Sequence, residues 1–463
     1  MFPSRHSEEG GASASLSLTP GTLAGRASTS ATGPSELIGL GANLSMTGNV
    51  LSATASVALP SPTFAYEINH IICYGQSLSI GYAGVAPIST TQKYNALMFA
   101  QGLRPEDDYP AGSAATWYAS LVAMVEAAGQ TNTVGETVNS GTADMVSQMV
   151  LSENGIGYAS HNYQMMGSSP GFSSTTIAQL SLGSTYFTRL LAHVSNGLSL
   201  SNAAGKVYGV PAVTWMQGER DYSLGTTRAA YTTSLNTLIS DLNTQIKATS
   251  GQVDSVHLIS YQVASHLEYN RGTPDIAIAQ FNVSGTNALM HIAMAMYQFD
   301  YTGIVHLTAS SYRWAGAYFG LAFKRIVIDK QNWKPLQPIS SVRQGSTVVA
   351  TFNVPKGVLV FDTTWVTAVA NMGFTLADAA GTDLPITSVS IIDWNRVKIV
   401  ATSAVPAGAF LRYGWVGTGN TLAGRTSGAR GNLRDTQGNT IVFEPAGQNS
   451  PMHNWCLIFE WAL

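Results

Sequence analysis

The stretch INHIICYGQSLSIG, residues 68–81, decides how the rest of the chain is interpreted. It begins with a short apolar run, residues 68–73, whose length and β-branched side chains are typical of a buried strand. Ser77 follows closely, so its hydroxyl is expected at a corner between strand and loop. In an open α/β sheet, ligands bind in the crevice beyond the carboxyl ends of the strands. A serine there is a nucleophile if a base reaches it and backbone N–H groups face the oxyanion. The other interpretation is a turn that happens to contain a serine.

The composition narrows the class of protein. A chain of 463 residues is too long for one ordinary domain and predicts two or three. Charged residues make up only 11% of the chain, a balance common in secreted or virion-borne β-rich proteins. The net charge of −3 gives no electrostatic footprint for nucleic acid or for anionic lipid, so we expect neither as a partner.

Several kinds of segment and site are not expected. No run approaches ~18 consecutive apolar residues, so we expect no membrane span. The first nine residues lack the apolar core of a signal peptide, so a protein working outside a cell would leave by another route. No His, Cys or carboxylate group has metal-ligand spacing, and we expect no metal and no cofactor. Cys73 and Cys456 lie in apolar runs and are expected to be buried free thiols. His70 and His193 have apolar neighbours and are expected to be structural.

The middle of the chain alternates between strand-like and helix-like patterns, which predicts βαβ units and a mostly parallel sheet. Strands are predicted at 207–216, 256–263 and 288–294, and helices at 114–128, 184–197, 228–249 and 312–327. After Lys334-Pro335, short alternating strands replace the helical patterns, which is typical of an antiparallel β-sandwich. These strands are predicted at 346–353, 357–361, 388–392, 397–401 and 409–415.

Three further blocks carry polar residues in patterns that suggest chemistry. Residues 170–180 read PGFSSTTIAQL, a loop containing Gly171. Residues 215–221 read WMQGERD and end a predicted strand, where the Gln217 amide can point into the crevice. Residues 301–308 read YTGIVHLT and precede a predicted helix.

Taken in this order, the four blocks resemble those of the SGNH (GDSL-type) hydrolases. The GQS sequence at 75–77 resembles the variant found in the sialate O-acetylesterase-like carbohydrate esterases. It is not the G-x-S-x-G elbow of α/β-hydrolases, because Ser79 stands where the second glycine would be. The resemblance implies a flavodoxin-like three-layer α/β domain with a parallel sheet over residues 65–330, followed by an antiparallel β-sandwich over 331–463.

The resemblance also implies roles for individual residues. Ser77 would be the nucleophile and His306 the general base. The oxyanion would be held by the backbone N–H of Ser77, by a donor from Gly171 or Ser173, and by Gln217. Ser173 and Ser174 stand where glycine is usual in the family, so the donor on this loop is left open.

One departure concerns the acid that orients the histidine. The family pattern is D-x-x-H-L-T, and here Gly303 occupies the Asp position. Three alternatives remain: Asp300 reaches around the turn, Glu219 approaches from the neighbouring strand, or a backbone carbonyl orients the ring of a Ser–His dyad.

Residues 1–64 are rich in Gly, Ser, Ala and Thr and carry few charges. The pieces 21–26 and 40–53 resemble the Gly-punctuated β segments of bacteriophage tail and tail-fibre proteins. The alternative is a disordered Ser/Gly linker.

These observations lead to a functional hypothesis. We expect a carbohydrate O-acetylesterase that removes acetyl groups from a bacterial surface polysaccharide as part of a phage tail, located in the virion or outside the cell. Other tail proteins or further copies of the chain are expected partners. The segment 81–110 is expected to shape specificity. Two alternatives remain: a glycan-binding tail protein without activity, and a secreted bacterial esterase acting on plant or host glycans.

Overall fold

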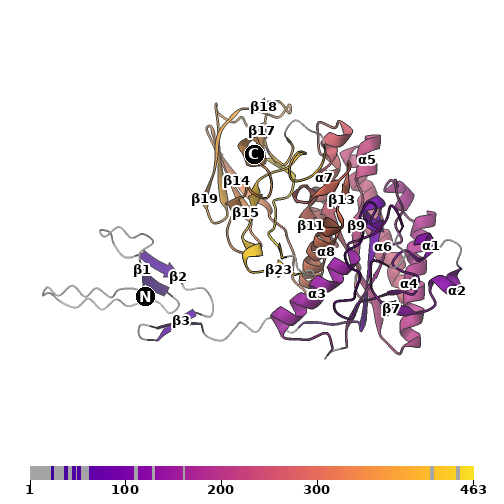
Figure 1. Ribbon diagram of the computed structural model, residues 1–463. Helices are drawn as coiled ribbons and strands as arrows, with labels where there is room; N and C mark the ends of the chain where they lie inside the picture. Colours follow the sequence, from indigo (N-terminus) through magenta and orange to yellow (C-terminus); the bar gives the residue numbers. More distant parts are fainter. Residues whose placement is uncertain are drawn as a thin grey trace. The chain divides into compact units, whose positions relative to one another are not determined.

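The computed structural model describes residues 22–25, 36–39, 44–47, 50–53, 62–108, 113–127, 131–159, 162–417, 422–444 and 449–463. The chain divides into two compact units, Met1–Ser61 and Pro62–Leu463. In the first unit, β1 (Thr22–Gly25) pairs with β2 (Glu36–Gly39), and β3 (Leu44–Thr47) pairs with β4 (Val50–Ala53), both antiparallel (Figure 1). β1, β3 and β4 fall in the pieces expected to form short β segments. Their likeness to tail proteins stays a prediction, and most of residues 1–61 lie outside the described part of the chain.

The second unit is built on a seven-stranded sheet with the strand order β11-β10-β9-β5-β8-β6-β7. All neighbouring strands are parallel except β7, which runs antiparallel to β6. The strands are β5 (Ile68–Gly75), β6 (Leu97–Phe99), β7 (Leu121–Ala123), β8 (Gln164–Ser168), β9 (Tyr208–Met216), β10 (His257–Gln262) and β11 (Met290–Ala295). The predicted strands 207–216, 256–263 and 288–294 are therefore confirmed as β9, β10 and β11.

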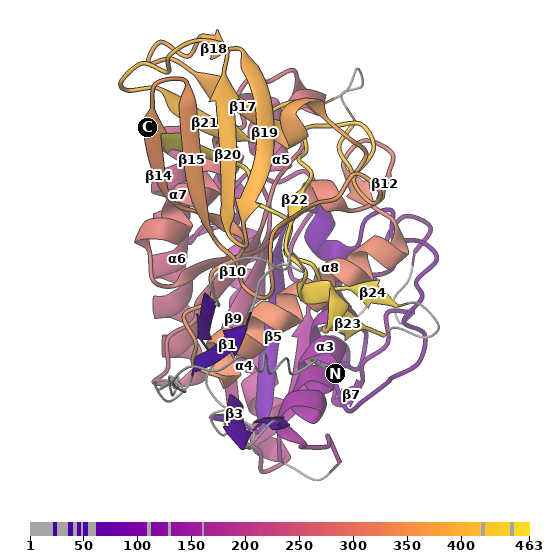
Figure 2. The ribbon, with the colours of Figure 1, turned by 90° about the vertical axis from the view of Figure 1, so that its left-hand side faces the viewer.

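Helices cover both faces of this sheet, which gives the three layers that were expected (Figures 1 and 2). On one face α3 packs against α8, and on the other α4 packs against α6 and α6 against α7. The larger helices are α3 (Asn139–Asn154), α4 (Thr185–Ala203), α6 (Arg228–Ser250), α7 (Asp275–Thr286) and α8 (Ala309–Phe323). The short ones are α1 (Pro105–Asp108), α2 (Ala114–Trp117) and α5 (Glu219–Leu224). The predicted helices 184–197, 228–249 and 312–327 are confirmed, the last continuing past α8 into a π-helical turn, Lys324–Ile328.

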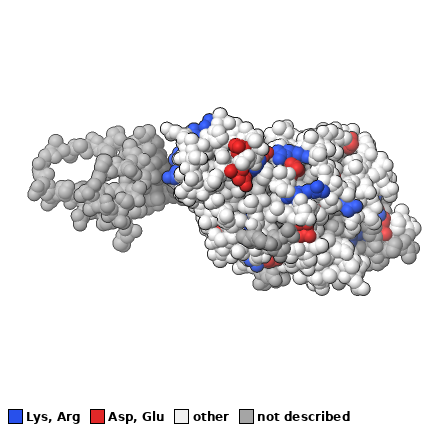
Figure 3. Space-filling view, turned by 90° about the horizontal axis from the view of Figure 1, so that it is seen from above, with Lys and Arg blue, Asp and Glu red and all other residues white. Residues whose placement is uncertain are grey.

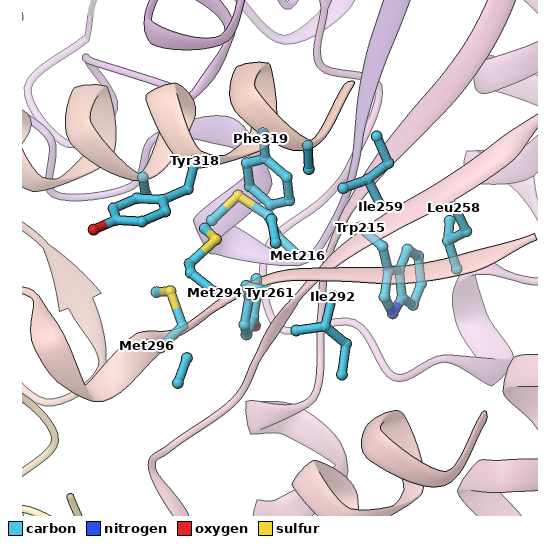
Figure 4. Packing of buried hydrophobic residues seen from close by; sticks show 14 of the residues in the cluster. Trp215, Met216, Leu258, Ile259, Tyr261, Ile292, Met294, Met296, Tyr318 and Phe319 are labelled. Atoms are coloured by element: carbon cyan, nitrogen blue, oxygen red, sulfur yellow. The ribbon is translucent and has the colours of Figure 1, made fainter. Parts of the chain in front are cut away.

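The core between the sheet and α8 is made of large apolar side chains. Phe319 of α8 lies over Met216 of β9 and Met294 of β11, and all three are nearly inaccessible to solvent (Figure 4). Burial of such side chains stabilises the fold by about 1.5–3 kcal/mol each. This packing fixes the positions of the strand ends that carry the functional side chains.

The predicted helix at 114–128 is wrong. Only Ala114–Trp117 is helical, and Leu121–Ala123 forms β7 at the edge of the sheet, paired with Leu97–Phe99 of β6. The apolar run around Leu121 fits a strand as well as a helix, and the free edge of β6 decided between them.

Helix α3 was missed because its buried face is polar. Asn139, Ser140, Thr142 and Asp144 are all buried in it. The side chains of Asn139, Thr142 and Asp144 are paired inside the protein; for example, Asp144 binds Arg313 of α8 at 2.5 Å. Over the first turn of the helix, buried polar groups therefore stand where an amphipathic helix would show an apolar stripe, and the buried apolar side chains follow only after it.

Antiparallel sheets follow the α/β part, as expected. One four-stranded sheet has the order β14-β15-β20-β19 and the other β18-β17-β21-β25. Their strands are β14 (Gln337–Gln344), β15 (Thr347–Asn353), β17 (Phe374–Ala377), β18 (Asp383–Leu384), β19 (Ile386–Asp393), β20 (Arg396–Ala401), β21 (Phe410–Tyr413) and β25 (Phe459–Ala462). Short two-stranded pairs complete this region: β16 (Val360–Phe361) with β22 (Leu433–Arg434), and β23 (Val442–Phe443) with β24 (Ser450–Pro451). Of the predicted strand 357–361, only the last two residues are extended.

The C-terminal region packs against the α/β part through specific hydrogen bonds. The Gln262 side chain bonds both backbone groups of Ile458, and the Tyr297 hydroxyl donates to the Cys456 carbonyl at 2.6 Å. Residues 62–463 accordingly form one compact unit, and the predicted boundary near residue 330 stays a prediction.

The surface carries little charge. On the face seen in Figure 3, Lys, Arg, Asp and Glu are scattered among uncharged side chains. Within the described residues, no helix has both the length and the apolarity needed to cross a membrane.

Candidate active site

The first three sequence blocks meet because they follow three neighbouring strands. Ser77 comes after β5, Gly171 after β8 and Gln217 after β9, and these strands are adjacent and parallel in the order β8-β5-β9. The chain enters the sheet at β5 and places later strands on both sides of it. β5 therefore ends at the point where the strand order reverses, the usual place for a ligand crevice in such sheets.

The fourth block reaches this crevice through His306. Its Nε2 atom lies 2.9 Å from the Ser77 Oγ atom, although the two residues are 229 positions apart. Ser77 is buried in the first turn of a 3₁₀ helix, Ser77–Ile80. Burial lowers the pKa of His306 below its usual value, so the ring is neutral at pH 7 and can accept the Ser77 proton. A serine hydroxyl in hydrogen-bond contact with a neutral histidine is the geometry that nucleophilic catalysis by serine requires.

A short hairpin presents His306. β12 (Tyr301–Thr302) pairs with β13 (His306–Leu307), so that Thr302 lies opposite His306. Gly303, at the position of the family's Asp, is in the turn with φ +66°, in the left-handed region that glycine adopts most readily. The turn geometry gives a local reason for glycine at this position.

Neither candidate acid bonds His306. Asp300 accepts a hydrogen bond from Arg425 Nε at 2.6 Å. Glu219 accepts one from the Tyr261 hydroxyl at 2.6 Å, and burial raises its pKa to about 7. Among the described residues, Ser77 is the hydrogen-bond partner found for the His306 ring. In the described part of the chain, no backbone carbonyl accepts a hydrogen bond from the His306 ring either, so the third alternative is not seen in this arrangement. What the carboxylates do in catalysis stays a prediction.

Packing, in place of an acid, holds the imidazole. The Tyr82 ring lies against it with a centroid distance of 4.6 Å. Tyr82 is itself fixed, since its N–H donates to the Ser77 carbonyl and its carbonyl accepts from the Tyr312 hydroxyl. Tyr82 belongs to the segment 81–110 that was expected to shape specificity, but its contact with His306 was not foreseen.

Backbone donors are free next to Ser77. Among the described residues, no acceptor is found for the N–H groups of Ser77, Gly171 and Ser173. Gly171 is tightly enclosed: a Cβ there would lie 2.1 Å from Ser79 Oγ and 2.5 Å from the Gly75 carbonyl oxygen. Only glycine lets this loop approach the end of β5 so closely. These N–H groups can therefore supply the donors of an oxyanion hole.

Gln217 was expected to donate to the oxyanion, but both of its amide hydrogens are engaged. Its Nε2 donates to the Thr175 carbonyl and to Asp221, and its Oε1 accepts from the Tyr231 hydroxyl. The side chain is completely buried. In this arrangement Gln217 fastens the loop of the second block to the end of β9, and reaching an oxyanion would cost it one of these bonds.

The second block keeps the glycine-like backbone despite its serines. Ser174 has φ +59°, a conformation that non-glycine residues seldom adopt. The loop therefore has a backbone conformation at Ser174 that favours glycine, although a serine stands there. Ser174 is exposed, and Ser173 is half-buried.

Gln76 was overlooked although it lies in the first motif. Its Oε1 accepts from the backbone N–H groups of Gly218, at 3.4 Å, and Arg220, at 3.0 Å. It thereby ties the end of β5 to the start of α5. The middle residue of GQS thus has a structural role that its buried position beside Ser77 could have suggested.

The remaining predictions concern residues away from this crevice. Cys73 and Cys456 are buried free thiols, as expected. His70 bonds Tyr208 and Ser168 in the core, and His193 bonds Glu106 at 3.0 Å, which confirms their structural interpretation. The described residues contain no group of three or more His, Cys, Asp or Glu side chains placed to hold a metal ion.

No profile of a known protein family matches this sequence, and no curated protein matches it significantly. Among solved structures, a carbohydrate acetylesterase from Xanthomonas citri is similar, with a TM-score of 0.52 and 15% identity over 85% of this chain and 80% of that one. NanS has a TM-score of 0.40 and 12% sequence identity, over 57% of this chain and 97% of that one. A protein from Arabidopsis thaliana has a TM-score of 0.38 and 17% sequence identity, over 55% of this chain and 97% of that one. The Xanthomonas likeness establishes the fold alone, a three-layer α/β architecture followed by antiparallel sheets.

Proposed function

We propose that the protein is a carbohydrate O-acetylesterase that works through a Ser77–His306 dyad. The observation that carries this proposal is the 2.9 Å contact between Ser77 Oγ and His306 Nε2 at the carboxyl end of β5. A neutral histidine in contact with a serine hydroxyl, beside unpaired backbone N–H groups, is what acyl transfer needs.

In the first half-reaction, Ser77 Oγ attacks the acetyl carbonyl carbon while its proton passes to His306 Nε2. The carbonyl oxygen becomes an oxyanion, which the N–H groups of Ser77 and Gly171, unpaired among the described residues, would stabilise. The bond between the carbonyl carbon and the sugar oxygen then breaks, and the sugar oxygen takes the proton back from His306. Ser77 is left acetylated.

In the second half-reaction, water attacks the acetyl group on Ser77 and gives a proton to His306. The bond from the carbonyl carbon to Oγ breaks, Oγ takes the proton from His306, and acetic acid leaves and ionises to acetate in solution. His306 acts as base and then as acid in each half, so no cofactor enters the balance.

The substrate and the location are further parts of the proposal. We propose an acetylated bacterial polysaccharide as substrate and a place in a phage tail, on the strength of the sequence resemblances of the four blocks and of residues 1–64. The low charge of the chain suits a substrate recognised by its hydroxyl and acetyl groups. Absence of the protein from purified virions would remove the tail assignment and leave the esterase proposal intact.

A second candidate, a glycan-binding protein without turnover, is favoured by one observation. Neither Asp300 nor Glu219 bonds His306, and loss of the orienting acid costs about 10⁴ in rate where it has been measured in a Ser-His-Asp enzyme. An exported cellular esterase is the third candidate, and it shares the site chemistry.

The test is acetate release from p-nitrophenyl acetate and from an acetylated bacterial polysaccharide. We expect wild-type turnover and a loss of about a thousandfold or more in kcat for both Ser77→Ala and His306→Ala.

Ser79→Ala is the matched control. Ser79 is a second buried serine on the same 3₁₀ helix, and its hydroxyl only bonds the Gln76 carbonyl, which also accepts from the Ser79 N–H. Unchanged hydrolysis in Ser77→Ala would overturn the mechanism. Binding of the polysaccharide without any wild-type hydrolysis would favour the second candidate.

A further inference from the structure

An aromatic pair joins the loop of the second block to helix α4. The rings of Phe172 and Tyr186 are stacked with a centroid distance of 4.7 Å and an interplanar angle of 16°. Phe172 directly follows Gly171, and Tyr186 lies in the first turn of α4. The guanidinium carbon of Arg189 lies 5.5 Å from the Tyr186 centroid and 6.0 Å from that of Phe172, an additional contact that fixes the pair.

Phe172 is exposed to solvent, whereas Tyr186 is half-buried. Phe172 is 38% exposed, and it is the one phenylalanine among the described residues that counts as an exposed large apolar side chain. Full burial of a phenylalanine side chain stabilises a protein by about 1.5–3 kcal/mol relative to exposure, and the exposed Phe172 ring forgoes part of this stabilisation. The ring is instead presented to solvent with its partner stacked behind it.

The backbone of Phe172 is tied to the end of β5, the strand that leads to Ser77. The Phe172 N–H donates to the Gly75 carbonyl at 3.0 Å, and the Phe172 carbonyl accepts from the Thr175 hydroxyl at 2.7 Å. Both polar groups of its backbone are therefore occupied, one of them by a residue two positions before Ser77. The residue that carries the exposed ring is thus anchored at the end of β5, where Ser77 also lies.

We propose that Phe172 and Tyr186 form a sugar-ring subsite, which holds the pyranose that carries the acetyl group scissile at Ser77. This rests on the proposed esterase function. The axial C–H groups of a pyranose form an apolar face, and an aromatic ring offers a flat surface with negative charge above its plane. A preformed apolar wall with few polar groups is the usual composition of a small-ligand site. The subsite would select cyclic polyol esters over acyclic ones.

The test compares two polyol acetates, glucose pentaacetate as the cyclic ester and glycerol triacetate as the acyclic one, by acetate release. For Phe172→Ala we expect kcat/KM on glucose pentaacetate to fall about tenfold, mainly through KM, and that on glycerol triacetate to stay within twofold. Phe172→Tyr should restore the cyclic substrate, whereas Phe172→Leu, which is apolar but not aromatic, should not. Trp394→Ala is the matched control, because Trp394 is also an exposed aromatic residue but lies on the turn between β19 and β20.

A binding measurement on an inactive variant tests the subsite separately from the esterase activity. Titration of glucose pentaacetate into Ser77→Ala should give a Kd that rises about tenfold when Phe172→Ala is added. If the wild type hydrolyses neither ester but this binding difference appears, the esterase proposal fails and the subsite stands. Equal losses on both esters would mean that Phe172 only supports the Gly171 loop, and no loss on glucose pentaacetate would mean that the ring does not contact the sugar. Either result overturns the subsite.

Discussion

The Asp300 carboxylate is held by Arg425, whose Nε lies 2.6 Å from Oδ1, and not by His306. Arg425 also donates to the Trp365 carbonyl at 3.0 Å and lies over the Trp365 ring, while its backbone N–H bonds the Phe299 carbonyl. The C-terminal region is thereby fastened to the chain six residues before His306. Asp300 thus connects two parts of the fold, a role quite different from orienting an imidazole.

Asp300→Asn should therefore have a small effect on activity. We expect kcat/KM on p-nitrophenyl acetate to fall less than tenfold. The pair is partly exposed, and its loss should cost about 1 kcal/mol or less in stability. Arg425→Gln should have a similar effect, since it breaks the same contact. A drop of a thousandfold or more in Asp300→Asn alone would show that Asp300 turns towards His306 during the reaction.

The pH dependence of the rate should report His306. Because burial lowers its pKa below the usual value of 6.5, the ring loses its proton at a lower pH and becomes a competent base there. The kcat/KM for a small ester should therefore rise with pH along a limb centred below pH 6.5 and then level off.

The titration of Glu219 could be mistaken for that of His306 in this profile, because burial raises the pKa of Glu219 to about 7. The same profile measured in Glu219→Gln should keep its midpoint. A midpoint above 6.5, or one that moves with Glu219→Gln, would contradict the assignment to His306.

Glu219 should affect stability in a pH-dependent way. Since burial raises its pKa, the folded state holds a proton between pH 4.5 and 7 that the unfolded state releases, so its contribution to stability falls as pH rises through this window. Glu219→Gln removes this dependence and leaves an oxygen for the Tyr261 hydroxyl. Urea unfolding should show the variant gaining about 2–3 kcal/mol relative to wild type between pH 5 and pH 8. Parallel changes in the two proteins would count against a protonated Glu219.

Gly171→Ala should impair the oxyanion loop. The added Cβ meets the Gly75 carbonyl oxygen, which belongs to the central strand and cannot move away, and such overpacking costs about 1–3 kcal/mol. We expect kcat to fall at least tenfold. Adding Ser79→Ala should not rescue it, because the contact with Gly75 remains.

Gly272→Ala is the control for this substitution, since a Cβ there meets nothing within 4 Å. Full activity in Gly171→Ala would place the oxyanion donors elsewhere.

The sequence predicted a parallel sheet and four of its strands, β5, β9, β10 and β11, because short apolar runs alternate there with helical patterns, whereas β6, β7 and β8 were not predicted. Ser77, Gly171 and Gln217 each end a parallel strand, and strand ends of one sheet lie together. His306 was expected from its motif alone. By contrast, two errors arose from tertiary pairing. Residues 121–123 form a strand because they pair with the edge of β6, and helix α3 was missed because polar residues in it are buried.

The details of the site lie beyond sequence patterns for a similar reason. Arg425, which occupies Asp300, is 125 residues away in the chain, and Gln217 is bound by Asp221 and Tyr231 within its own neighbourhood. The motifs indicated which side chains gather at the crevice. Which hydrogen bonds those side chains make is decided by competition among partners that only the folded chain brings together.

The most direct test of the account is covalent labelling with an organophosphonate, which reacts with an activated serine and stays attached. Peptide mapping by mass spectrometry should find one label per chain, on Ser77, and the labelling rate should fall by at least a hundredfold in His306→Ala. A label on another residue, or an unchanged rate on Ser77 without His306, would contradict the Ser77–His306 dyad.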